Sequence, residues 1–84
     1  MQNKQQLWAV ANDEHNWIIV DIISGRTKKI GSVGAPRSNY YDNAVKEATR
    51  RNRKFGINGY VFIHEQYNKY LNLRKYLGST IRRE

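Results

Sequence analysis

Basic side chains recur at helical spacing in the middle of the chain. The residues at i, i+4, i+7 and i+8 are Lys46, Arg50, Arg53 and Lys54. On a helix they would form one column on the same face, where like charges repel one another. A phosphate backbone would offset this repulsion through the release of counterions. The spacing therefore indicates a phosphate-binding surface, with a solvated helix face as the simpler alternative.

Positive charge is concentrated in the second half of the chain. The 84 residues contain 15 Lys and Arg against seven Asp and Glu, a net charge of +8. Residues 1–36 hold four basic and three acidic groups, whereas residues 37–84 hold eleven and four. Segregation of this kind favours a polyanionic partner. Further candidate phosphate ligands in the basic half are Arg37, Arg51, Arg74 and Lys75. We expect Glu47 to neutralise part of the charge on Arg51, four residues later.

Aromatic residues alternate along a predicted strand beside these cations. Tyr60 and Phe62 share one face of that strand with His64, and Val61 and Ile63 share the other. If the aliphatic pair packs against the helix, the aromatic pair lies on an open sheet face. Exposed aromatics next to Arg and Lys can stack on unpaired bases. The alternative is that Phe62 belongs to the core and Tyr60 shields the sheet.

The type of nucleic acid follows from which motifs the sequence contains. It has no helix-turn-helix pair, zinc-finger spacing or basic zipper, and an arginine-rich helix beside aromatics suits recognition by shape and phosphate. We therefore favour RNA over DNA. No nucleophile–base arrangement, phosphate-binding glycine loop or metal-ligand spacing is present. We expect a non-catalytic protein with no cofactor and no metal site.

The elements that must position these residues can be read from periodicity and turn signals. Strands are expected over residues 7–11, 17–23 and 26–30, a helix over 40–55 that ends at Gly56, and a strand over 60–64. Residues 66–77 fit a further hairpin strand, which we favour, or a helix. In the second strand Ile18, Val20 and Ile22 should point into the core, because the single charge, Asp21, lies on the opposite face.

These elements predict one α+β domain over residues 1–84, with flexible ends at 1–6 and 78–84. We expect a small antiparallel sheet: a three-stranded meander, then one helix, then a strand or hairpin. The helix should pack on one face and leave the other open.

Composition indicates the cellular compartment of the protein. There is no cysteine, and the longest apolar run, residues 17–23, is interrupted by Asp21. That run is far shorter than the roughly 20 residues of a membrane span, and the N-terminus lacks the apolar core of a signal peptide. We expect a soluble protein of a reducing cytoplasm that does not associate with membranes.

The order of elements also resembles that of known small domains. The helix sequence Asp42–Ala48 (DNAVKEA), followed by Gly59–His64 (GYVFIH), resembles small β–α–β domains of bacteria and phages over residues 17–75. Size and basicity resemble early proteins of T4-type phages, among them the phage inhibitors of a toxin–antitoxin RNase (TifA). This resemblance implies an antagonist of a host toxin RNase or defence system that acts through RNA in the host cytoplasm. It assigns no residue roles.

Two functional hypotheses follow. The first is an RNA-binding protein that holds phosphates through the basic helix face and bases through aromatics. The second is a protein-binding inhibitor whose basic face docks on an acidic patch of a host enzyme such as a toxin RNase. The oligomeric state is open.

Overall fold

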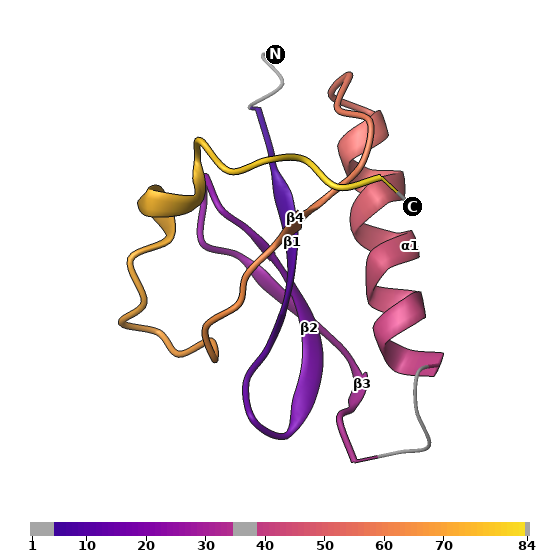
Figure 1. Ribbon diagram of the computed structural model, residues 1–84, viewed down its shortest axis with the longest axis vertical. Helices are drawn as coiled ribbons and strands as arrows, with labels where there is room; N and C mark the ends of the chain where they lie inside the picture. Colours follow the sequence, from indigo (N-terminus) through magenta and orange to yellow (C-terminus); the bar gives the residue numbers. More distant parts are fainter. Residues whose placement is uncertain (1–4, 35–38, 84) are drawn as a thin grey trace.

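The computed structural model describes residues 5–34 and 39–83, in which a sheet lies between a helix and an irregular segment (Figure 1). The elements in chain order are β1 (Trp8–Asn12), β2 (Asn16–Asp21), β3 (Thr27–Ser32), α1 (Asn39–Arg53), β4 (Val61–Phe62) and a 3-10 helix, η1 (Leu73–Tyr76). In Figure 1, α1 lies on one side of the sheet, and residues 64–77, which include η1, lie on the other.

The sheet has the strand order β3-β2-β1-β4. β1, β2 and β3 form the predicted antiparallel meander. β4 runs parallel to β1 and pairs Ala9 with Val61 and Val10 with Phe62. The predicted α+β class and the single helix on one face are confirmed, but the sheet is mixed rather than antiparallel. The reason is that α1 returns the chain along the sheet before β4 begins.

One face of the sheet packs under α1, which the sequence predicted over 40–55. Ala44, Val45 and Ala48 are buried against a cluster from the sheet that contains Trp8, Val10 and Ile19. The small alanines let the helix approach the sheet closely. α1 ends at Arg53, two residues before the predicted end, and Gly56 adopts the expected left-handed conformation, with φ 77°, in the turn that follows.

The opposite face of the sheet is also covered, so the expectation of an open face is wrong. Ile18, Val20 and Ile22 are buried as predicted, together with Val61 and Ile63. Their cover comes from residues 64–77 and from the loop after α1, namely Tyr67, Leu71, Leu73, Tyr76 and Ile57. Both faces of β2 are therefore buried, including Ile19 on the helix side.

Residues 66–77 do not form the favoured hairpin strand, and in place of the alternative helix they contain only the short 3-10 helix η1. The amide of Tyr67 donates to the carbonyl of Asn12 at 2.7 Å, which ties the segment to the end of β1. Asn68 and Asn72 then accept hydrogen bonds through their side chains from the amides of Tyr70 and Arg74. Side-chain bonds of this kind compete with regular secondary structure, so the chain turns instead of extending.

Candidate nucleic-acid interface

The outer face of α1 carries the predicted basic column. Its members are exposed and lie away from the buried stripe of Ala44, Val45 and Ala48. Lys46, Arg50 and Arg53 are on α1, and Lys54 is the first residue after its end. Arg50, Arg51 and Arg53 occupy the last turn of the helix, where positive charge is favourable to the helix dipole. The column thus has a local structural benefit and also presents cations to solvent.

Glu47 neutralises part of this charge. Its carboxylate accepts from Nη2 of Arg50 and from Nε of Arg51, each at 2.6 Å. The hydrogen bond from Arg50, followed by that from Arg51, lowers the pKa of Glu47 to about 2. The guanidinium of Arg51 also lies over the Trp8 ring, 4.6 Å from its centroid. The sequence predicted the ion pair between Glu47 and Arg51. The structure adds a second pair, between Glu47 and Arg50, and it shows that the Arg51 side chain is half-buried against Trp8.

The remaining predicted cations do not join the column. Arg74 is exposed and lies in η1, on the other side of the sheet from α1 (Figure 1). Lys75 is also in η1, where its Nζ lies 2.5 Å from a Glu65 carboxylate oxygen. Arg37 lies outside the described residues. The basic half of the sequence therefore does not form one continuous face.

The aromatic stacking platform is not formed, which corrects the placement of Tyr60 and Phe62. Tyr60 is only 7 % exposed and packs in the cluster under α1, with Phe62 half-buried beside it. The register decides this: Phe62 pairs with Val10, which faces the helix, and Val61 pairs with Ala9, which faces away. The aliphatic residues thus face residues 64–77, the reverse of the expected orientation.

Phe62 is enclosed by other side chains. Its ring packs edge-on against the rings of Tyr41 and His64, with centroid separations of 6.1 and 4.9 Å, respectively. The Arg82 guanidinium lies 4.9 Å from the centroid of the Phe62 ring. The Tyr41 and Tyr60 hydroxyls lie 3.4 Å apart. Burial, together with the Tyr60 hydroxyl, raises the pKa of Tyr41 to about 12. These contacts stabilise the packing and leave the Phe62 ring little room for a base.

The C-terminal end, residues 78–83, contacts the rest of the fold through Arg82. Tyr60 and Arg82 exchange two backbone hydrogen bonds of 2.8 Å. Gly59 adopts φ 134°, and a Cβ at this position would overlap the Arg82 carbonyl oxygen. Figure 1 shows this end of the chain returning from the η1 side to α1. The sequence predicted neither the bridge nor the nearness of Arg83 to the helix.

A small pocket lies where this end of the chain meets α1. It has a volume of about 250 Å³ and is lined by Thr49, Arg53, Asn58, Gly59 and Arg83. Thr49 is 95 % buried, and its hydroxyl oxygen has no hydrogen-bond partner within the described part of the chain. Of these residues only Arg53 was predicted from the sequence. The helical spacing of Thr49 and Arg53 places them side by side, but nothing local indicates Arg83.

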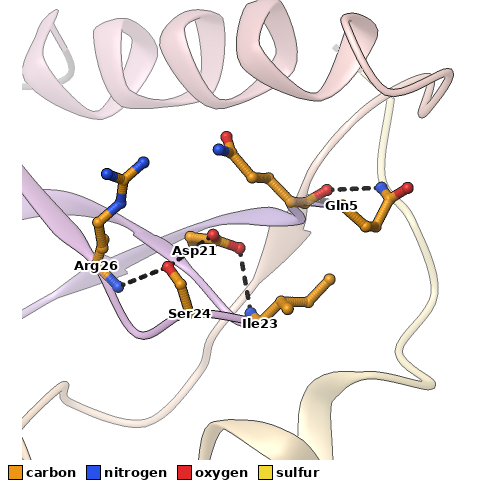
Figure 2. A pocket seen from close by; sticks show the side chains of 6 residues that line it. Gln5, Asp21, Ile23, Ser24 and Arg26 are labelled. Atoms are coloured by element: carbon orange, nitrogen blue, oxygen red, sulfur yellow. Dashed lines mark hydrogen bonds between the residues drawn. The ribbon is translucent and has the colours of Figure 1, made fainter. Parts of the chain in front are cut away.

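A larger pocket, of about 470 Å³, lies at the turn between β2 and β3 (Figure 2). Asp21, which the sequence placed opposite the core, is 1 % exposed here. Its carboxylate accepts from the amides of Leu7 and Ile23 at 3.0 and 3.1 Å and from the Ser24 hydroxyl at 2.8 Å. These bonds hold the turn, so Asp21 has a structural role.

Other kinds of site receive no support from the geometry. Across residues 5–34 and 39–83, no three acidic or histidine side chains gather to hold a metal ion. Within the same ranges, no helix is long and apolar enough to cross a membrane. His15 sits in an exposed turn, with Nε2 3.9 Å from a Glu14 carboxylate oxygen.

The chain matches no protein-family model, no curated protein and no solved structure.

Proposed function

We propose that this protein binds nucleic acid, with RNA as the expected ligand, and holds phosphates along the outer face of α1. The observation that carries the proposal is the exposed column of Lys46, Arg50, Arg53 and Lys54. Among the described residues, Glu47 is the one carboxylate paired with this column, through Arg50. Three of the four cations thus have no ion-pair partner in the described ranges.

The length of the column suits a phosphate backbone. Lys46 and Arg53 are separated by seven residues, or roughly 10 Å along the helix axis. This distance is comparable to about three base steps along one strand of double-helical DNA, whose rise is about 3.4 Å per step. Neighbouring cations in the column can therefore each meet a different phosphate of one strand.

RNA is favoured because contact through phosphates and shape needs no base reading. α1 packs along the sheet, and its buried stripe faces Trp8, Val10 and Ile19. What it offers a ligand is a charged surface, which suits backbone and shape recognition. The aromatic residues Tyr60 and Phe62 are not part of this proposal, since both pack under α1. The inhibitor role that the phage resemblance implies would act through such bound RNA.

The test compares two triple variants that remove equal charge. The first replaces Lys46, Arg50 and Lys54 by Gln. The second replaces Lys29, Lys69 and Arg74 by Gln, all exposed and outside α1. Binding to single-stranded and duplex RNA and DNA is measured over a salt series. About four phosphate contacts predict a slope of log K against log salt near −3.

Each lost phosphate contact lowers the magnitude of the slope by about one. The α1 triple variant should therefore reduce that magnitude by about two to three and bind much more weakly. The matched triple should retain most of the affinity. Equal losses in both would show that binding follows net charge alone and would overturn the α1 interface. If a protein partner from host extract stays bound after nuclease treatment and no nucleic acid binds, the protein-docking alternative holds instead.

A further inference from the structure

We infer that the pocket between α1 and the C-terminal end is a phosphate-binding site, formed by Arg53, Arg83, Thr49 and Asn58. This inference rests on the proposed function and deepens it, because it names a place on the basic surface where a phosphate group is held in a fixed geometry. The rest of the column contacts phosphates from an open helix face.

The Thr49 hydroxyl is the first reason. A buried hydroxyl with no partner costs free energy, and such groups in folded proteins call for an explanation. Thr49 lines the pocket, and its hydroxyl has no partner among the described residues. Threonine in a helix populates two χ1 rotamers. Rotation about χ1 can thus turn the hydroxyl to donate to an anion in the pocket.

The second reason is the charge of the lining. Arg53 and Arg83 both line one small pocket together with Asn58, and none of the described residues that line it is acidic. Within the described ranges neither arginine has an ion-pair partner, although Arg50 and Arg51 nearby share Glu47. Arginine presents planar donors that match phosphate oxygens.

The third reason is how the pocket is assembled. Arg83 follows Arg82, whose backbone is fixed by the two hydrogen bonds to Tyr60. Gly59 lets that backbone approach, since any Cβ there would overlap the Arg82 carbonyl. Arg83 therefore reaches Arg53, thirty residues earlier, through tertiary structure.

The volume of the pocket suits one small anionic group rather than a larger ligand. At about 250 Å³ it lies below the roughly 300–1,000 Å³ of sites for drug-sized ligands. A phosphate group fits this class, whether it is an internal phosphodiester or a terminal monoester. Both present the same anionic oxygens to the arginines.

The first experiment titrates inorganic phosphate into the protein at constant ionic strength and follows backbone amides by NMR. We expect saturable shifts at Thr49, Asn58 and Gly59. Thr49→Val should weaken phosphate binding by about tenfold or more, the effect of losing a hydrogen bond to a charged group. Thr49→Ser, which keeps the hydroxyl, and Arg74→Gln, remote from the pocket, should retain it. Arg83→Gln should weaken it as Thr49→Val does.

The stability of Thr49→Val separates a binding role from a structural one. Removing an unpaired buried hydroxyl should leave the protein equally or more stable to urea, while phosphate binding falls. Shifts that do not saturate, or equal binding by Thr49→Val and wild type, would overturn the site.

The second experiment compares 5′-phosphorylated and 5′-hydroxyl RNA oligonucleotides of one sequence. Tighter binding of the phosphorylated strand, lost in Arg83→Gln, assigns the pocket to a terminal monoester. Equal affinity that is lowered alike by Arg83→Gln assigns it to an internal phosphodiester. Saturable inorganic phosphate without binding of either oligonucleotide would uphold the pocket and reject the proposed function. Salt-dependent RNA binding without phosphate saturation would do the reverse.

Discussion

Asn52 on α1 hydrogen-bonds both backbone groups of Trp8 on β1. Its Oδ1 accepts from the Trp8 amide at 2.6 Å, and its Nδ2 donates to the Trp8 carbonyl at 3.0 Å. Nδ2 also donates to the Gly59 carbonyl at 2.8 Å. One fully buried side chain therefore joins the helix, the first strand and the wall of the phosphate pocket.

Replacing Asn52 by Ala should destabilise the fold strongly. The change leaves the buried amide of Trp8 and two carbonyl groups without their partner, and we expect a loss of about 3 kcal/mol in the free energy of unfolding. Urea denaturation followed by Trp fluorescence measures it. The exposed Asn43 on the same helix is the control, and Asn43→Ala should change stability by less than about 1 kcal/mol. Equal effects would contradict the role of Asn52.

Replacing Glu47 by Gln should tighten nucleic-acid binding. Glu47 pairs with Arg50 and Arg51, so its neutralisation frees both guanidinium groups and makes the α1 surface more positive by one charge. The salt dependence of RNA binding should become steeper. Glu65→Gln makes the same charge change on the η1 side, where Glu65 pairs with Lys75, and should leave binding nearly unchanged.

The stability of the protein should depend on the charge of Glu47 at acidic pH. Hydrogen bonds from Arg50 and Arg51 lower its pKa from an ordinary 4.5 to about 2. Because the folded state binds this proton less readily than the unfolded state, the contribution is complete above pH 4.5 and is lost as the pH falls toward 2. Urea midpoints across this range should fall more for the wild type than for Glu47→Gln. Parallel curves would show that the pair adds nothing to stability.

Replacing Gly59 by Ala should detach the C-terminal end. Its φ of 134° disfavours any side chain, and the added Cβ would overlap the Arg82 carbonyl. We expect a loss of about 1–3 kcal/mol from backbone strain, with faster hydrogen exchange at the amides of Tyr60 and Arg82. Gly78→Ala, where a Cβ meets no atom within 4 Å, is the matched control. Unchanged exchange in Gly59→Ala would refute the docking.

The pKa of Tyr41 should be visible at high pH. Burial and the Tyr60 hydroxyl raise it from the ordinary 10.0 to about 12. The folded state therefore keeps this proton longer than the unfolded state, and the contribution to stability is lost as the pH rises from 10 toward 12. Phenolate absorbance of the wild type minus that of Tyr41→Phe isolates the residue. A difference that titrates near pH 10 would place the Tyr41 hydroxyl in water.

Local signals in the sequence predicted the elements well. Alternating β-branched residues identified β2, and the burial of Ile18, Val20 and Ile22 is confirmed. Helical spacing identified α1, its buried stripe and its exposed column, because both sets depend on the 3.6-residue period alone. Gly56 is left-handed as predicted, since this conformation is a local requirement, although α1 ends at Arg53, two residues before the predicted end.

The prediction for residues 66–77 was wrong because the structure of this segment depends on asparagine side chains that accept hydrogen bonds from nearby backbone amides. It also depends on apolar residues that cover a sheet face. Neither appears as a period in the sequence. The same residues also cover Val61 and Ile63. Because the sequence did not predict this cover, it could not show whether Tyr60 and Phe62 face α1 or the other side of the sheet.

The sequence by itself determined the meander, the helix and the cations on one helix face, because these follow from contacts between residues a few positions apart. Tertiary structure alone decided which cations from distant parts of the sequence lie close together. A parallel register between β1 and β4 turned Phe62 toward the helix, and the bridge from Tyr60 to Arg82 carried Arg83 to Arg53. Pairing over such separations depends on how the whole chain packs, which spacing along the sequence does not encode.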